Sequence, residues 1–122
     1  MRAMTLILLL SDDGARGRAA LSLALAESAL GRPATLFAQE RAVALLAAAP
    51  RADDETEALA AAGLPDRRAL LAMAVESGVS LIACQTGLAL TGLTLPDLVP
   101  GVEAGGLMGL AATLGEARWL TV

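Results

Sequence analysis

The chain has 122 residues, which is enough for one compact domain and too short for two, so we expect a single domain over residues 1–122. Its nine basic residues, all arginine, and thirteen acidic residues leave a formal net charge of −4, which disfavours nucleic-acid phosphate as the main partner. With no histidine, no tyrosine and one cysteine, the chain cannot build a Ser-His-Asp triad, a histidine metal site or an internal disulfide, and we expect no metal and no cofactor.

The predicted elements begin with a continuous apolar run from Met4 to Leu10, which is typical of a strand buried on both faces of a parallel sheet. A helical pattern follows from Ala15 to Leu30 and stops at Gly31. A second strand is expected from Pro33 to Ala38, and helical character resumes from Glu40 to Ala48. The first third of the chain therefore alternates strand and helix.

The segment from Pro50 to Pro65 is rich in acidic residues and is expected to be a solvated surface connection beside a helical start. Asp66 is a suitable N-cap for a helix that ends at Gly78. Beyond it we expect a strand over Val79 to Ala83 and a short helix over Cys84 to Thr91. The segment Gly101-Val102-Glu103 then precedes a helix in "AGGLMGLAATLGEA", and Arg118 to Val122 is expected to form the final strand.

No stretch of the sequence predicts a membrane anchor. The first apolar run is short and is followed at once by Asp12 and Asp13, and it lacks the small-residue cleavage pattern of a signal peptide. The run "AALSLALAESAL" is interrupted by Glu27 and is much shorter than the ~20 residues of a membrane helix. We therefore expect a cytoplasmic protein with no membrane partner.

Strands that alternate with helices through short turns pair in parallel through right-handed crossovers. The expected architecture is a three-layer α/β fold, flavodoxin-like or Rossmann-like, with an open, mostly parallel five-stranded sheet and helices on both faces. In such sheets ligands bind beyond the carboxyl ends of the strands. The candidate crevice residues at those ends are Ser11, Asp12, Gly14, Gln39, Cys84, Gln85, Thr86, Gly87, Glu103, Gly105 and Gly106.

Cys84 is the candidate catalytic residue, because a thiol at the first turn of a helix faces unpaired backbone N–H groups that stabilise the thiolate. The alternative is that Cys84 is an inert core residue, since cysteine is among the most buried residue types. The sequence alone leaves both interpretations open.

The other candidate positions each have a structural alternative. The stretch "SDDGARG" could hold an anion through backbone amides at a helix start, with Arg16 or Arg18 assisting, but it lacks the nucleotide-binding glycine motifs, and a plain N-cap turn would look the same. Asp12 and Asp13 could act as an acid–base pair or simply cap the helix. The glycines after Glu103 allow close approach of the backbone to a ligand, or tight helix packing.

The C-terminal sequence "ACQTGLALTGLTLPDLVPGVEAGGLMGLAATLGEARWLTV" resembles the C-terminal half of DsrE/DsrF-like proteins, in particular the branch with a strand-end cysteine. The opening "MTLILLLSDD" matches the first strand of that family more loosely. The resemblance implies a flavodoxin-like fold and assembly as a homotrimer or homohexamer. It also implies a role for Cys84 in sulfur relay, as a persulfide carrier or sulfurtransferase. The residues that carry it are Cys84, Gly92, Asp97, Leu98, Gly101, Val102, Glu103, Gly105 and Gly106.

Two functional hypotheses follow. In the first, the Cys84 thiolate accepts sulfane sulfur from a donor protein and passes it to an acceptor thiol. In the second, the chain is a noncatalytic oligomeric module that binds a small anion or another ligand, and its cysteine is incidental. Self-association is expected in either case, because helices with almost no polar face must bury more than one side.

Overall fold

The computed structural model describes residues 4–122, and its centre is one sheet of five strands in the order β4-β3-β2-β1-β5. All four strand pairings are parallel. This confirms the expected parallel α/β sheet. The strands are β1 (Thr5–Leu9), β2 (Ala34–Ala38), β3 (Ser80–Cys84), β4 (Glu103–Gly105) and β5 (Arg118–Thr121).

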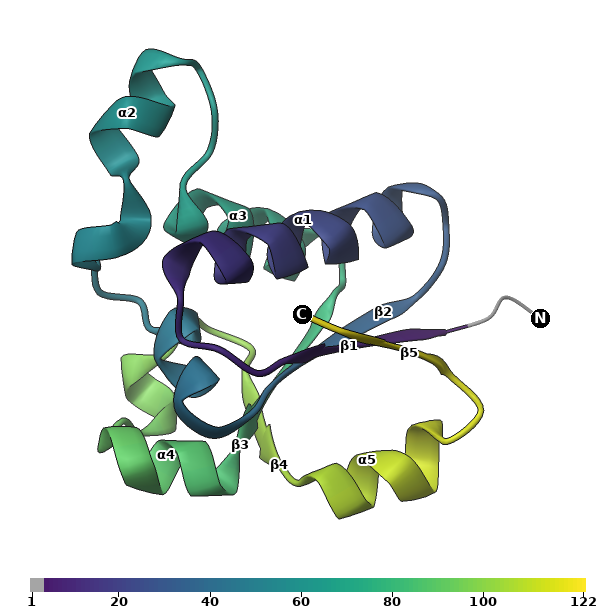
Figure 1. The fold of residues 1–122 in the computed structure, drawn as a ribbon. Coiled ribbons are helices and arrows are strands. Elements are labelled where there is room, and N and C mark those ends of the chain that lie inside the picture. Colours follow the sequence, from purple (N-terminus) through teal and green to yellow (C-terminus); the bar gives the residue numbers. More distant parts are fainter. Residues whose placement is uncertain (1–3) are drawn as a thin grey trace.

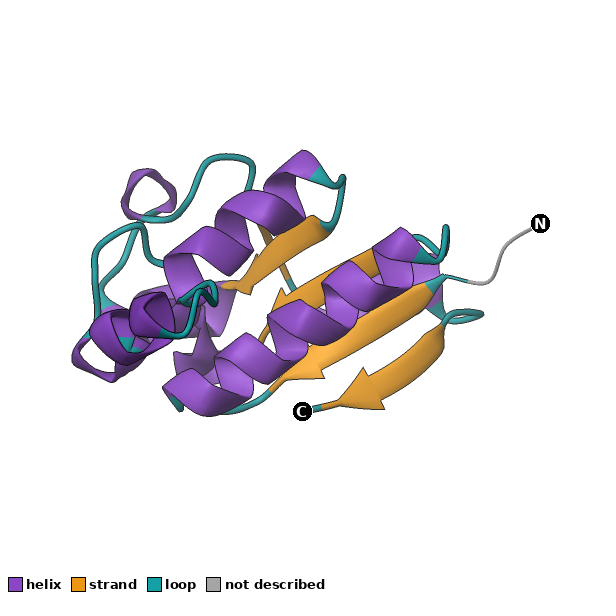
Figure 2. Ribbon diagram, turned by 90° about the horizontal axis from the view of Figure 1, so that it is seen from above, coloured by secondary structure: helices purple, strands orange, loops and turns teal. Residues whose placement is uncertain are grey.

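Helices cover both faces of the sheet, which gives the three expected layers (Figure 1). One face carries α1 (Gly14–Ala29) and α3 (Arg67–Glu76), and the other carries α4 (Gln85–Thr91) and α5 (Leu107–Leu114). Viewed from above, helices lie along the strands rather than across them (Figure 2). Three 3-10 segments and one short helix complete the chain: η1 (Glu40–Leu46), η2 (Ala52–Asp54), α2 (Thr56–Ala61) and η3 (Leu95–Asp97).

The core explains why the first two strands read as unbroken apolar runs. Both β1 and β2 lie inside the sheet with a neighbour on each side, and every residue of β2 is buried. Helix α1 packs closely on this part of the sheet through small residues, among them Gly17, Ala20 and Ala24. A Cβ at Gly17 would lie 2.8 Å from a methyl group of Leu45, so a larger residue at this position would push the helix away.

The fourth strand and the last helix begin later in the chain than the sequence indicates. Gly101 takes a left-handed conformation with φ of 92°, and the chain turns there before it can pair with β3. Strand β4 therefore starts at Glu103 and includes Ala104 and Gly105, which we expected to open the helix. Helix α5 starts only at Leu107, after Gly106.

The acidic segment is not wholly a solvated connection. Helix α2 buries none of its residues and projects from the body of the molecule (Figure 1). Asp54, however, is 1% exposed, and its Oδ1 accepts a hydrogen bond of 2.7 Å from Nε of the fully buried Arg67. The expectation of a surface segment is therefore wrong at Asp54, because its charge is paired inside the protein.

Within residues 4–122, no helix is both long enough and apolar enough to cross a membrane.

Candidate functional site

Cys84 lies at the junction of β3 and α4, as the last residue of the strand and the N-cap of the helix. Its register partner on the neighbouring edge strand is Gly105, which has no side chain to cover the sulfur. The cysteine is a free thiol and is 8% exposed. Little of Cys84 is therefore accessible to a reacting group.

The surroundings of Sγ favour the thiolate over the thiol. Burial raises the pKa of Cys84, but hydrogen bonds from the backbone N–H groups of Glu40, Gly87 and Thr86, and from the Thr86 hydroxyl, lower it. The net effect places the pKa of the thiol below its ordinary value. Two of these N–H groups belong to the first turn of α4, where helical amides have no partner within the helix. The site therefore holds a nucleophilic sulfur that is partly shielded from water.

The third backbone donor, Glu40, comes from a different element and requires an unusual backbone conformation. Glu40 opens η1 with φ of 57°, in the left-handed region that non-glycine residues rarely adopt. Its N–H contributes to the lowered pKa of Cys84, while its carbonyl packs against the start of α4. A Cβ on Gly87 would lie 2.1 Å from that carbonyl oxygen and 2.5 Å from Cγ2 of Val43. Only glycine at position 87 allows η1 and α4 to approach this closely.

A buried arginine holds the far end of η1 in place. The Arg67 guanidinium donates to the carbonyl oxygens of Leu45, Ala47 and Ala49 at 3.0, 2.8 and 2.8 Å, and it pairs with the Asp54 carboxylate. Arg67 thus satisfies one backbone carbonyl of η1, that of Leu45, and two carbonyls of the connection that follows it. Because Glu40 and these carbonyls belong to one short segment, Arg67 supports the position of the Glu40 amide.

The candidate residues after β1 do not gather around Cys84. Strand β2 separates β1 from β3, and the turn after β1 packs instead against the segment around Asp53. The N–H of Gly14 donates to Oδ2 of Asp53 at 2.8 Å, and Arg51 Nη2 donates to the Asp12 carbonyl at 2.8 Å. A carboxylate of the chain itself therefore occupies the helix start, which the sequence offered either as an anion site or as a plain N-cap turn. The Ser11 hydroxyl accepts a hydrogen bond from the N–H of Asp13 and serves the same turn.

Of the two arginines suggested for anion binding, Arg18 has partners for its side chain within the protein, and Arg16 contributes its backbone N–H to the cap. Asp13 caps α1 by accepting a hydrogen bond of 3.0 Å from the backbone N–H of Arg16. The side chain of Arg18 donates to the carbonyl oxygens of Asp53 and Asp54 and pairs with Glu55. The turn is therefore a network of internal contacts, and capping is its role in the structure.

Most of the remaining candidate residues lie near Cys84, at the carboxyl ends of the strands, and one lies on the face of the sheet that α5 covers. Gln39, Gln85 and Thr86 lie beside the Cys84 junction, and Gln39 precedes the Glu40 amide directly. Gly105 is in register with Cys84, and Gly106 is the N-cap of α5. Glu103 is in register with Ile82, two residues before Cys84, and lines a separate cavity.

Sequence reasoning did not find the Glu40 amide or the Arg67–Asp54 pair. A backbone donor in a left-handed conformation leaves no trace in residue type, because glutamate is an unusual choice for that conformation. A buried ion pair between residues thirteen positions apart has no periodic signature either. Among residues 4–122, no group of three or more potential metal-binding side chains lies together.

Comparison with known proteins identifies relatives over the whole chain. The model of the DsrE/DsrF-like family matches residues 4–121. The crystal structure of the ychN protein from E. coli is 22% identical, with a TM-score of 0.69 over 100% of both chains. The structure of MTH1491, a protein of unknown function from Methanobacterium thermoautotrophicum, is 17% identical, with a TM-score of 0.71 over 98% of this chain and 99% of that one. A search of curated proteins gives no match. At these identities the solved structures support the fold alone.

Proposed function

This chain belongs to the DsrE/DsrF-like family, and on that premise we propose that it is a sulfur-relay protein in which Cys84 carries sulfane sulfur as a persulfide. The observation that carries the proposal is the set of hydrogen-bond donors around Sγ, which lowers the pKa of the thiol although the residue is buried. The thiolate is the reactive form of cysteine in sulfur exchange.

The transfer needs one cysteine and no external oxidant. The Cys84 thiolate attacks the terminal sulfur of a donor persulfide, a new S–S bond forms at Sγ, and the donor's S–S bond breaks. The donor leaves as a thiolate, and Cys84 becomes a persulfide. An acceptor thiolate then attacks the outer sulfur, and Cys84 returns to the thiolate form. Donors aimed at Sγ stabilise it as the leaving group in this second step.

The limited exposure of Cys84 constrains the donor and the acceptor. With 8% of the residue accessible, a broad protein surface cannot reach Sγ, whereas a sulfur at the end of an extended arm can. We therefore expect the partners to present sulfur on a cysteine in a flexible segment or on a small molecule.

The competing hypothesis, a small-anion module with an incidental cysteine, loses support at the turn after β1. The Gly14 amide that would bind an anion there already holds Asp53. The alternative remains an outcome of the experiment.

Mass spectrometry of the intact protein tests the proposal. After incubation with a persulfide donor, the wild type should gain the mass of one sulfur atom, and a reducing thiol should remove it. Cys84→Ser is the control, since it is nearly isosteric and should fold alike but gain no sulfur. Alkylation of the native wild type should remain fast below the ~8.5 pKa of an ordinary thiol. If Cys84 reacts only after denaturation, or takes up no sulfur, the carrier mechanism is wrong and the binding-module hypothesis replaces it.

We also propose that the chain assembles as a homotrimer or homohexamer. Helix α5 buries only Leu110, and it leaves Leu107 37% and Met108 88% exposed. Exposed apolar side chains of this kind on one helix are typical of a subunit contact. Met108→Glu should lower the molar mass in light scattering, whereas Ala58→Glu, on helix α2, which buries none of its residues, serves as a control. A monomeric mass for the wild type at micromolar concentration contradicts the proposal.

A further inference from the structure

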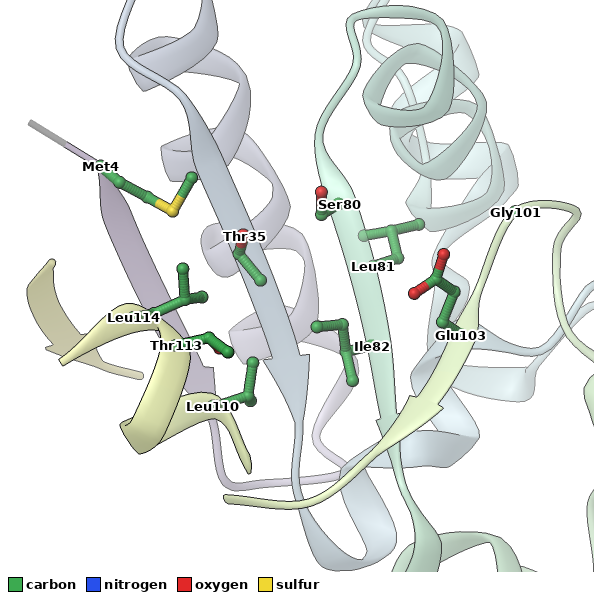
Figure 3. A pocket seen from close by; sticks show the side chains of 10 residues that line it. All are labelled: Met4, Thr35, Ser80, Leu81, Ile82, Gly101, Glu103, Leu110, Thr113 and Leu114. Atoms are coloured by element: carbon green, nitrogen blue, oxygen red, sulfur yellow. The ribbon is translucent and has the colours of Figure 1, made fainter. Parts of the chain in front are cut away.

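A cavity of about 290 Å³ lies between α5 and the sheet, lined by ten residues (Figure 3). Its lining includes Met4 and Ser80, at the amino ends of β1 and β3, whereas Cys84 lies at the carboxyl end of β3. The volume has room for roughly ten non-hydrogen atoms, at the ~30 Å³ that each water occupies in the liquid. Cys84 does not line this cavity, so an occupant would bind independently of the proposed sulfur transfer.

One side of the cavity is apolar. Figure 3 shows Met4, Leu110 and Leu114 together on this side, with Ile82 below the centre of the cavity. Leu110 and Leu114 are one helical turn apart on α5, so they present a continuous aliphatic surface toward the sheet. This surface suits a short hydrocarbon chain.

The other side carries oxygen atoms on three neighbouring strands. Thr35 of β2 is the register partner of Ser80 of β3, and Glu103 of β4 is the register partner of Ile82, two residues further along. All three side chains line the cavity (Figure 3). Thr35 and Ser80 are therefore cross-strand neighbours, whereas the Glu103 carboxylate lies on β4, next to the strand of Ser80 and two strands from Thr35.

The charge of the lining selects between possible ligands. Among the described residues that line the cavity, Glu103 is the only charged one, and no arginine is present. An anionic ligand would meet a like charge and no cation. A primary ammonium group offers N–H donors for the Glu103 carboxylate and for the Ser80 hydroxyl on the neighbouring strand.

From this lining we propose that the cavity binds a small aliphatic primary ammonium compound, with its hydrocarbon chain against α5 and its ammonium group at Glu103. Glu103 is exposed, so the ammonium group lies at the mouth and keeps part of its hydration. Solvent-exposed ion pairs are weak, so the carboxylate should improve affinity by about threefold to fivefold rather than by orders of magnitude.

The chain contains its own reporter for this site. Trp119 is its single tryptophan, and the indole N–H donates to the carbonyl oxygen of Leu114 at 3.2 Å. The side chain of Leu114 lines the cavity. An occupant that contacts Leu114 should therefore change the fluorescence of Trp119.

The experiment titrates the intact wild-type protein with hexylammonium, hexanol and hexanoate at constant ionic strength and follows Trp119 fluorescence. Hexylammonium should give a saturable change, hexanol a weaker one and hexanoate none. Glu103→Gln should weaken hexylammonium binding about threefold to fivefold and bring it close to that of hexanol. Glu116→Gln is the matched control, because it removes the same charge from an exposed residue outside the lining.

Three results would overturn the proposal. The first is binding of hexanoate as tight as that of hexylammonium, which would mean that Glu103 does not select the ligand. The second is an equal loss of affinity in both glutamine variants, which would reduce the effect to net charge. The third has two parts: no ligand gives a saturable change, and the Trp119 fluorescence of the protein alone changes with protein concentration. That result would assign the cavity to a contact between copies of the chain.

Discussion

Gly87→Ala tests whether the approach of η1 to α4 activates the cysteine. The added Cβ would lie 2.1 Å from the Glu40 carbonyl oxygen and 2.5 Å from Cγ2 of Val43, where ordinary contacts exceed 3 Å. The Glu40 carbonyl must therefore move, and because it is joined to the Glu40 N–H through one Cα, we expect that N–H to shift relative to Sγ of Cys84. Loss of one hydrogen bond to a charged group costs about 1.5 kcal/mol or more, which corresponds to roughly a tenfold smaller thiolate fraction below the thiol pKa.

The same substitution should also lower stability. Overpacking costs about 1–3 kcal/mol, and alanine recovers about 1 kcal/mol of helix propensity, so we expect a net loss of up to about 2 kcal/mol. The assays are urea denaturation and the pH dependence of iodoacetamide alkylation of native protein.

Gly109→Ala is the matched control for this experiment. Gly109 lies within α5, and a Cβ there meets nothing within 4 Å. Alanine should stabilise this variant by about 0.5–1 kcal/mol and leave alkylation unchanged. If Gly87→Ala keeps the wild-type stability and alkylation profile, the Glu40 amide does not contribute to the reactivity of Cys84, and the reasoning is refuted.

Three further substitutions test other contacts. Thr86→Val removes the hydroxyl but keeps the backbone N–H, so alkylation below the thiol pKa should slow, but less than in Gly87→Ala; an unchanged rate would exclude the hydroxyl as a donor. Arg67→Met leaves the buried Asp54 carboxylate without its partner and should lower the free energy of unfolding by about 3–5 kcal/mol in urea denaturation; a loss below about 1 kcal/mol would contradict this. In the folded protein the pKa of Glu27 falls from 4.5 to about 2, chiefly through its hydrogen bond from Arg32. The lowered pKa stabilises the fold above pH 4.5, and this stability is lost as the pH falls toward 2, so the advantage of wild type over Glu27→Gln should shrink across that range.

Much of the fold could be predicted because β1 and β2 are almost wholly buried, β3 is buried over most of its length, and the helices between the strands have recognisable caps. Asp66 accepts a hydrogen bond from the N–H of Ala69, as an N-cap residue does, and Gly78 takes the left-handed conformation expected after a helix. Strand β4 is different, because it has three residues and lies at the edge of the sheet. Its position depends on pairing with β3, and no local pattern encodes that pairing.

The candidate site was predictable only where it depends on neighbours in the chain. The position of Cys84 at a strand-to-helix turn follows from the apolar run before it, and the first-turn amides follow from helix geometry. The Glu40 donor depends on a contact between segments more than forty residues apart, and it exists because position 87 is glycine. In the sequence, Gly87 reads as an ordinary glycine within a short helix, where it weakens the helix.

That weakening explains why the contact and the reactivity of Cys84 are physically coupled. Alanine has the higher helix propensity and would favour helix α4 by itself. Glycine at position 87 therefore stabilises the protein only by allowing η1 to approach α4 closely. The Glu40 carbonyl group occupies the space that a side chain at position 87 would fill. Glu40 is itself held in a left-handed conformation that costs about 1 kcal/mol or more. A glycine that weakens its helix thus contacts a glutamate with a strained backbone, and the N–H of that glutamate donates a hydrogen bond to the sulfur of Cys84. Local strain of this kind persists where the surrounding structure enforces it, and it is common at functional sites. The Gly87–Glu40 contact therefore favours a reactive cysteine over an incidental one.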